Sequence, residues 1–561
     1  PAFGFPSPEA EKGVRVQTPH GPVDVPGLGD PNAPESNSLA VIDVGNPESP
    51  RLLKFVRTGK PFGPRSNGGS SPSGLAVSSS ALYVSNGNQD SITVIDAATL
   101  EVRAEIELRI PRLEAYRGIL PLGMALDQAS GRLYVAEAGI NAVGVVDVGR
   151  DRLIGHLAAG WFPAAVVLDR GQVFVASAKG LGTGPNATRT APLAASFQAE
   201  LTRGVLSVFS QPQPRALPIL TERVMALNGF LPLDETPAAA PPEIKYVVLI
   251  VKENRTFDEV FGYRGASGGV RGAPELARFG NRAWLEQTPG SLRIRSSGKK
   301  FYSVAPNHHA LADRYAISDN FYADAEVSVD GHHWVVGNYP NAWVETTRLA
   351  SYGGQKDFRF PTTAPGRLSY PQSNSSVHPE DQLEHGAIWH HLERHGVPFR
   401  NFGEGFELAG VDQSPGLKPT GSAYLTNVPM PEPLFRNTSR NYPGYNMNIP
   451  DQYRATQFIS EMEELYLKPG KEIPRFIFMH LPNDHLARPR PEDGYPFQAS
   501  YMADNDYALG RIVGFLSKTP YWKNMAILVT EDDAQGGVDH VDTHRTIFMA
   551  MSPYARKGYV S

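Results

Sequence analysis

The sequence predicts a multidomain protein in which an all-β N-terminal half is followed by an α/β C-terminal half. The chain has 561 residues, which is too many for one hydrophobic core. Short strand-like segments alternate with turn residues in the first half, whereas the second half contains longer apolar runs and a helical pattern. Residues 236–243 (TPAAAPPE) are typical of a linker. We therefore expect domains at residues 1–235 and 244–561.

A repeat of about 40 to 50 residues organises the N-terminal half. Copies begin at Pro72, Pro121 and Pro163, and each contains an aromatic strand, LYV, LYV and VFV. This period is typical of β-propeller blades, which bury both faces against their neighbours. The repeats resemble the YVTN-type propellers of bacterial surface and exported proteins over roughly residues 36–210. About four copies can be counted, which is few for a closed ring, so either the N-terminus is truncated or later segments complete the circle.

Charge and cysteine content exclude several classes of function. The chain has 53 Lys and Arg against 58 Asp and Glu, and no basic block stands out, which argues against nucleic acid as a partner. It has no cysteine, which excludes disulfides, thiolate zinc sites and cysteine nucleophiles. The N-terminal half has no cluster of His, Asp and Glu in its loops. We therefore expect it to be a scaffold, or a surface that binds another protein or the cell envelope.

The sequence gives indirect indications of localisation. No apolar run has the length of a membrane span, so we expect no transmembrane segment. The opening segment PAFGFPSPEA lacks the basic start and apolar core of a signal peptide, and the opening Pro suggests that a leader or a longer N-terminal part is missing. The lack of cysteine and the propeller resemblance favour an exported bacterial protein, whether periplasmic, secreted or at the cell surface.

Two buried strands are predicted in the C-terminal half. Residues 244–251 (IKYVVLIV) and 525–530 (MAILVT) are continuous apolar runs, as in parallel strands that are covered on both faces. Residues 501–516, which precede the second run, have helical spacing. Active sites of α/β sheets gather at the carboxyl ends of the strands. The residues that follow the two runs are therefore the first candidates for a functional site.

Acidic and amide side chains follow both runs. KENRTFDEVFG comes after the first, and EDDAQGGVDHVDTHR after the second. The three consecutive acids from Glu531 to Asp533 repel one another and persist most easily if a cation neutralises them. Oxygen ligands suit a hard ion such as Ca²⁺, whereas added histidines would admit Zn²⁺ or Mn²⁺. The alternative is a solvated acidic loop that holds no metal.

These motifs resemble those of a known family. ENRTFDEVFG resembles the opening motif of the phosphoesterase family that contains bacterial phospholipases C and acid phosphatases, within the alkaline phosphatase superfamily. EDDAQGGVDHV is similar to the second acidic motif of that family, and residues 307–329 match the segment between the two motifs. The resemblance implies an alkaline-phosphatase-like fold for the C-terminal half. It also implies metal-dependent hydrolysis of phosphate esters through a hydroxyl nucleophile.

The resemblance assigns roles to individual residues. The nucleophile falls on Ser328 if one residue of offset is allowed. Thr256 is the competing hydroxyl, although the family does not place its nucleophile at this position. The metal ligands fall on two pairs of adjacent residues, Glu253 with Asn254 and Asp532 with Asp533.

Histidines and one further carboxylate form a second set of candidates. His485 follows a short apolar strand at residues 476–479 and is a candidate catalytic residue, while Asp484 either binds metal or makes a turn. His540 and His544 lie in the acidic loop, where they could protonate a leaving group or complete a second metal site. We assign catalysis to His540 and metal binding to His544. Further histidines have no assigned role, namely His480 after the same strand and the pairs 308–309 and 332–333 that flank Ser328.

The sequence thus predicts a metal-dependent phosphoesterase with a seryl nucleophile and with Ca²⁺, Zn²⁺ or Mn²⁺ as its ion. One alternative is a non-catalytic cell-surface protein that binds through its propeller. Another is a hydrolase of sulfate or phosphonate esters, because the superfamily uses one metal frame for several esters. The Cys/Ser-x-Pro-x-Arg motif of sulfatases is absent from the sequence. Phosphomonoesters, phosphodiesters and phospholipid head groups all stay open as substrates.

Overall fold

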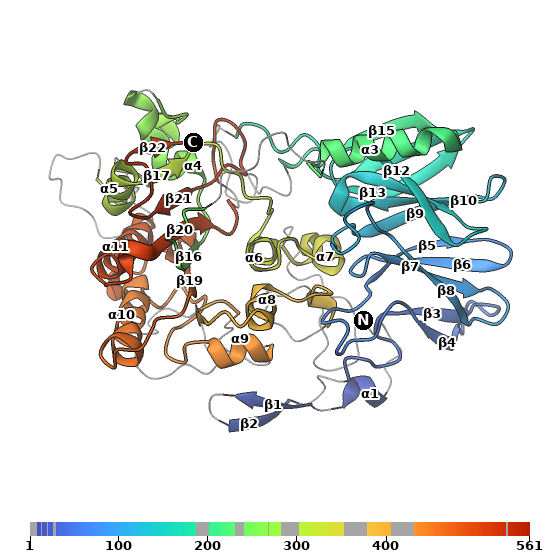
Figure 1. Ribbon diagram of the computed structural model, residues 1–561, viewed down its shortest axis with the longest axis horizontal. Coiled ribbons are helices and arrows are strands. Elements are labelled where there is room, and N and C mark those ends of the chain that lie inside the picture. Colours follow the sequence, from blue (N-terminus) through green and yellow to red (C-terminus); the bar gives the residue numbers. More distant parts are fainter. Residues whose placement is uncertain are drawn as a thin grey trace.

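In the computed structural model, an all-β part and an α/β part lie side by side (Figure 1). The all-β part is drawn in blue to green, and the α/β part in green to red. Among the described residues, no helix is both long and apolar enough to span a bilayer. The structure describes residues 8–12, 14–18, 21–25, 30–186, 201–230, 240–267, 269–281, 302–352, 379–405, 431–534 and 537–561.

Antiparallel sheets of consecutive strands make up the all-β part, as a propeller-like fold requires. Two sheets have four strands each, in the orders β5-β6-β7-β8 and β12-β11-β10-β9, and a third has the order β13-β14-β15. Strands β1 and β2 form one pair, and β3 and β4 another. The strands are β1 (Val14–Thr18), β2 (Gly21–Val25), β3 (Ser38–Asp43), β4 (Arg51–Arg57), β5 (Pro72–Val77), β6 (Ala81–Asn86), β7 (Ser91–Asp96), β8 (Val102–Glu107), β9 (Pro121–Asp127), β10 (Arg132–Glu137), β11 (Ala142–Asp147), β12 (Arg152–Ala158), β13 (Pro163–Asp169), β14 (Gln172–Ser177) and β15 (Val205–Ser210).

The central strands of the two four-stranded sheets are buried on both faces. Tyr83 and Val84 of β6, whose side chains point to opposite faces, are 3% and 2% exposed, and Tyr134 and Val135 of β10 are 0% exposed. Tyr83 packs in one hydrophobic cluster and Val84 in another, so neighbouring strands cover both faces. Strand β15 differs, since Leu206 and Val208 on one face are 67% and 51% exposed. Burial on both faces, which the repeats predict, is therefore confirmed for the inner strands and does not extend to β15.

The α/β part is built on a seven-stranded sheet of order β18-β19-β16-β20-β21-β17-β22. Strand β16 (Tyr246–Lys252) is central and runs parallel to β19 (Phe476–Leu481) and β20 (Met525–Glu531). Both buried strands expected from the apolar runs are therefore present and adjacent. The predicted fold class, a propeller-like all-β half followed by an α/β half, is confirmed. The other strands of this sheet are β17 (Ala316–Ser318), β18 (Phe399–Phe402), β21 (Phe548–Met551) and β22 (Tyr559–Val560).

Helices cover the sheet and connect its strands. Helix α11, which the sequence predicts at residues 501–516, packs against α10 and α5, and its apolar face joins the main hydrophobic core through Leu509 and Ile512. Helices α6 and α7 reach from the α/β part towards the propeller-like part (Figure 1). Among the described residues, the helices of the α/β part are α4 (Phe257–Phe261), α5 (Pro306–Arg314), α6 (Ser328–Gly337), α7 (Ala342–Tyr352), α8 (Ile388–Arg394), α9 (Glu432–Asn437), α10 (Asp451–Met462) and α11 (Ala499–Leu516). Helices α1 (Pro8–Glu11) and α3 (Leu217–Leu227) belong to the all-β part, where α3 packs against β12.

Polar contacts join the two parts of the molecule. At the start of α7, the Ala342 N–H donates to Oδ1 of Asn88 in the propeller-like part at 2.6 Å. The buried carboxylate of Glu384 accepts from Lys60 and Arg117 of the propeller-like part, both at 3.0 Å. The propeller-like part is therefore fixed against the part that carries the candidate site.

Candidate active site

The carboxyl ends of three parallel strands bring the candidate residues together. In the ladder, Val251 of β16 lies beside His480 of β19, and Lys252 lies beside Glu531 of β20. The residues that follow, Glu253 and Asp532, therefore leave the sheet at the same edge. This is the arrangement that the sequence predicts from the two apolar runs.

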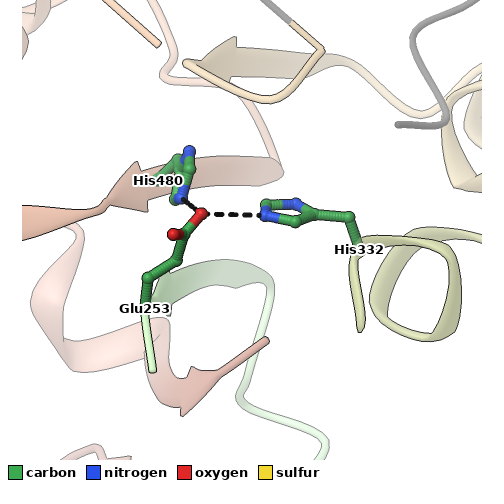
Figure 2. A group of neighbouring side chains, drawn as sticks. All are labelled: Glu253, His332 and His480. Carbon is green, nitrogen blue, oxygen red and sulfur yellow. Dashed lines mark hydrogen bonds and ion pairs between the residues drawn. The ribbon is translucent and has the colours of Figure 1, made fainter. Parts of the chain in front are cut away.

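Glu253 lies between two histidines in the interior (Figure 2). Its Oε1 is 3.1 Å from Nε2 of His480 and 3.4 Å from Nε2 of His332. Burial would raise the pKa of Glu253, but the hydrogen bonds from the two imidazoles outweigh it and hold the pKa well below its ordinary value. One ligand atom from each of the three residues lies within 4.8 Å of the others, so the group could hold a metal ion.

Asp532 adds buried negative charge to this group. Its Oδ2 lies 3.6 Å from Nε2 of His332, and neither of its side-chain oxygens has a hydrogen-bond partner among the described residues. Burial and the carboxylates of Asp533 and Glu253 raise the pKa of Asp532 well above its ordinary value. A buried carboxylate without hydrogen bonds is costly unless a cation neutralises it. The residues present therefore fit a divalent cation.

Ser328 lies at the first position of helix α6, beside the acidic pair. Its Oγ donates a hydrogen bond to Oδ2 of Asp533 at 3.1 Å. Asp330 holds the start of this helix, because its carboxylate accepts from the backbone N–H groups of Glu326 and Val327, both at 2.9 Å. The hydroxyl is therefore presented at a helix N-terminus, where backbone N–H groups and the helix dipole favour an anion such as phosphate.

The competing hydroxyl of Thr256 has a different environment. Thr256 caps helix α4, where its Oγ1 accepts from the Glu259 N–H at 3.2 Å and donates to the Val538 carbonyl at 2.6 Å. The residue is fully buried. Its hydroxyl is thus engaged in fixing the loop after β16.

Two predicted metal ligands have protein partners nearby. The carboxylate of Asp484 accepts from Lys252 Nζ at 2.6 Å and from the Glu253 N–H at 3.1 Å. Lys252 also donates to Glu531 at 2.8 Å, which makes a buried ion-pair network beneath Glu253. Oδ1 of Asn254 accepts from Arg255 at 2.9 Å. The structure thus places Asp484 in a contact that supports the backbone of Glu253.

The three remaining predicted histidines lie outside the group around Glu253. His485 is half-buried and its ring packs against Tyr445. Nδ1 of His540 is 2.6 Å from Asp258, and the two nitrogens of His544 face Asp542 at 2.6 Å and Glu326 at 3.4 Å.

A second group of possible metal ligands contains His540. Asp258, Asp539 and His540 offer ligand atoms within 4.8 Å of one another. However, Nη2 of Arg545 donates to both carboxylates at 2.9 Å, so an arginine already supplies the positive charge there. This group is a buried ion-pair network.

The charge of His544 is set by two carboxylates. Burial alone would lower the pKa of His544, but its hydrogen bonds to Asp542 and Glu326 outweigh burial and raise the pKa to about 9. The same bond lowers the pKa of Asp542 to about 2, against the effect of burial. At neutral pH the imidazolium therefore lies between two carboxylates.

Sequence reasoning gave no role to three residues that the structure places at the site. His332 lies four residues after Ser328 on one face of α6, and His480 is at the carboxyl end of β19. The position of each in the sequence therefore indicates that it could lie near the site. The sequence gives no such indication for Glu404. Its Oε2 accepts from Nδ1 of His332 at 2.7 Å and fixes which ring nitrogen faces Glu253.

Comparison with known proteins identifies the family. A model of the Phosphoesterase family matches residues 281–561, half of the chain, and the chain belongs to this family. The match begins after the ENRTFDEVFG motif, so the first predicted metal pair lies outside it. No curated protein matches the chain.

Similar solved structures include three proteins. A protein of the alkaline phosphatase superfamily from Vibrio parahaemolyticus is 16% identical, with 57% of this chain and 62% of that chain covered and a TM-score of 0.31. Hydrazine synthase from Kuenenia stuttgartiensis is 26% identical over 19% of this chain and 30% of that chain, with a TM-score of 0.18. Virginiamycin B lyase from Staphylococcus aureus is 17% identical, with 38% of this chain and 60% of that chain covered and a TM-score of 0.21. The chain spans less than two thirds of the length of each.

Proposed function

We propose that the protein hydrolyses phosphate esters, with Ser328 as nucleophile and a divalent metal ion as cofactor. One observation carries the proposal. Ser328 Oγ is hydrogen-bonded to Asp533, next to Asp532, whose two buried oxygens have no hydrogen-bond partner among the described residues. A hydroxyl beside a buried aspartate whose oxygens accept no hydrogen bond from any described residue is an arrangement that suits metal-assisted phosphoryl transfer. Membership of the Phosphoesterase family supports the same reaction class.

The proposed reaction proceeds in two displacements at phosphorus. Ser328 Oγ attacks the phosphorus in line with the leaving alcohol, and its proton moves towards Asp533, whose Oδ2 already accepts its hydrogen bond. The phosphoryl oxygens face the N-terminus of α6, where N–H groups favour negative charge. Water then attacks the phosphoserine, which releases phosphate and restores the serine. His485 and His540 stay candidates for protonation of the leaving group.

Three carboxylates and one amide at the edge of the sheet are the proposed ligands of the cation. Glu253, Asn254, Asp532 and Asp533 would hold it, and it would neutralise phosphoryl charge and lower the pKa of the Ser328 hydroxyl. The imidazoles of His332 and His480 beside Glu253 favour Zn²⁺ or Mn²⁺ over Ca²⁺. Asp484 and His544 stay predicted ligands, although both already have ion-pair partners in the protein.

The test is hydrolysis of p-nitrophenyl phosphate and bis-p-nitrophenyl phosphate by the full chain. EDTA should abolish hydrolysis, and one of Zn²⁺, Mn²⁺, Ca²⁺ or Mg²⁺ should restore it. The preferred ester separates a monoesterase from a diesterase. The proposal fails if a folded, metal-supplied protein hydrolyses neither ester. Hydrolysis of p-nitrophenyl sulfate or of a phosphonate ester instead would reassign the reaction within the same fold.

Two predictions about the cellular context also stand as proposals. Export from a bacterial cell is testable by fractionation of the native host with an antibody against the chain. Binding of the propeller-like part to another protein or to the cell envelope is testable by co-sedimentation with isolated envelopes. Recovery in the cytosolic fraction, or absence of the chain from the sedimented envelopes, would contradict the respective prediction.

A further inference from the structure

A ribbon of the propeller-like part contacts the α/β part close to Ser328. Its two segments, residues 181–184 and 201–203, pair through their backbones, because the Leu181 N–H donates to the Arg203 carbonyl and the Arg203 N–H to the Gly182 carbonyl, both at 3.0 Å. The segments therefore act as one unit, which we term the propeller ribbon.

The propeller ribbon binds the acidic loop that follows strand β20. The N–H groups of Thr183 and Gly184 donate to Oδ2 of Asp542 at 3.0 and 2.8 Å. Thr183 Oγ1 accepts from the Thr543 N–H at 3.0 Å. Just beyond the ribbon, Asn186 and Asp539 exchange two backbone hydrogen bonds of 2.9 and 3.1 Å. Thr543 Oγ1 also donates to Thr183 Oγ1 at 2.8 Å, and the Asn186 side chain donates to the Gly537 carbonyl at 3.1 Å. These hydrogen bonds tie the propeller-like part to this loop.

From Asp542 the contacts continue to the segment that carries Ser328. Oδ1 of Asp542 is 2.6 Å from Nδ1 of His544, and Nε2 of His544 is 3.4 Å from Oε1 of Glu326. The propeller ribbon reaches the same carboxylate directly, since Thr202 Oγ1 donates to Oε2 of Glu326 at 3.0 Å. Glu326 is 1% exposed, so both contacts are shielded from water.

Glu326 is two residues before the nucleophile. Its backbone N–H donates to Asp330, which caps helix α6 at Ser328. A shift of the Glu326 side chain would therefore move the backbone that aims the Ser328 hydroxyl at Asp533. Displacement of a nucleophile by about 1 Å can slow a reaction by roughly a hundredfold.

We propose that the propeller ribbon positions the Ser328 segment through Asp542, His544 and Glu326. Thr202, Asp542, His544 and Glu326 are positioning residues in this scheme. The propeller-like part is then required for full turnover and is more than a binding module. The inference rests on the proposed function insofar as turnover measures it, but the order of the Ser328 segment can be measured without turnover.

Two glycines provide a matched test. A Cβ on Gly182 (φ +57°) would lie 2.5 Å from Oδ2 of Asp542, whereas a Cβ on Gly171 (φ +75°) would meet nothing within 4 Å. Both substitutions strain a left-handed backbone, but only Gly182→Ala pushes on Asp542. We expect Gly182→Ala to lower kcat roughly tenfold to a hundredfold against Gly171→Ala, with KM changed less than about twofold.

A second pair of variants compares loss and retention of the Thr202 hydroxyl. Thr202→Val loses the hydrogen bond to Glu326, whereas Thr202→Ser keeps it. We expect a reduced kcat in the first and recovery in the second. If Gly182→Ala does not fold, this pair alone tests whether the propeller ribbon positions the Ser328 segment.

Hydrogen–deuterium exchange of the amides at 323–337 is the readout that does not need catalysis. Exchange there should be faster in Gly182→Ala and Thr202→Val than in their controls. Equal exchange and equal kcat within each pair would overturn the inference. If the wild-type chain hydrolyses no ester, the proposed function fails, and the exchange comparison alone decides whether the propeller ribbon orders the Ser328 segment.

Discussion

The two hydroxyls that are candidates for the nucleophile, those of Thr256 and Ser328, differ in their hydrogen-bond partners. Thr256 both accepts and donates in the cap of α4, whereas Ser328 donates to a carboxylate at the acidic edge of the sheet. A hydroxyl that satisfies buried backbone groups cannot leave them without cost. A hydroxyl side chain therefore stabilises the fold at one position and, in the proposed reaction, acts as the nucleophile at the other.

Thr256→Val should destabilise the protein without abolishing hydrolysis. Loss of the cap and of the bond to Val538 should lower the free energy of unfolding by about 1–3 kcal/mol. Thr256→Ser keeps the cap and is the control.

Ser328→Ala should instead lose hydrolysis and keep both its stability and its bound metal. Urea unfolding, ester hydrolysis and metal analysis of the three variants check this. Full hydrolysis by Ser328→Ala would contradict the assignment.

Asp532→Asn should make the metal-free protein more stable and insensitive to metal. The raised pKa of Asp532 means that its ionised form is penalised in the folded state, so a neutral amide relieves this penalty above the ordinary pKa of an aspartate. In EDTA the variant should therefore melt above the wild type. Added Zn²⁺ or Mn²⁺ should raise the melting temperature of the wild type only. An equal rise in both proteins would remove Asp532 from the set of ligands.

The elements around the site show which parts the sequence could predict. The apolar runs at 244–251 and 525–530 became the adjacent strands β16 and β20, and their carboxyl ends placed Glu253 and Asp532 at one edge. The contact between His332 and Glu404 joins α6 to the end of β18, two segments 72 residues apart in sequence. Periodicity gives no information on which of many polar loop residues meet at such a distance. The sequence therefore predicted the strand-end residues better than the residues that support them.

The contact between His544 and its two carboxylates should give the protein a characteristic pH dependence. The folded-state pKa of about 9 lies above the ordinary value, so this contact stabilises the protein fully below about pH 6.5 and is lost as the pH rises through 9. The free energy of unfolding should fall between pH 7 and pH 10 by on the order of 2 kcal/mol more in the wild type than in His544→Gln. Denaturant unfolding at several pH values measures this. If the free energy of unfolding falls with pH to the same extent in the wild type and in His544→Gln, the raised pKa of His544 is contradicted.

Across the whole molecule, charge complementarity holds the two parts together. Glu384 of the α/β part, with a side chain only 2% exposed, accepts from Lys60 and Arg117, and Lys179 faces the buried Glu345 at 3.6 Å. The propeller-like part supplies the cations and the α/β part the carboxylates. This arrangement fixes one relative orientation, as the contacts of the propeller ribbon with the Ser328 segment require.

Arg117→Met should weaken this arrangement far more than a matched change elsewhere. It leaves the buried carboxylate of Glu384 with Lys60 as its remaining cation, so the cost should lie below the roughly 3–5 kcal/mol of a fully uncompensated buried charge and above that of an exposed pair. Arg103→Met removes an exposed pair with Asp151 inside the propeller-like part and should cost less than about 1 kcal/mol. When unfolding is monitored separately in the propeller-like part and in the α/β part, the two parts should unfold at different denaturant concentrations only in Arg117→Met. Equal effects of the two changes would contradict the importance of this contact.

In the proposed reaction, Ser328 takes the phosphoryl group from the ester. Rapid quenching of the metal-loaded protein in acid during turnover, followed by peptide mass spectrometry, tests it most directly. We expect one phosphoryl group on the peptide that contains Ser328, and none on that peptide from Ser328→Ala. Turnover with phosphate on the Thr256 peptide, or with no phosphorylated peptide at any quench time, would contradict it.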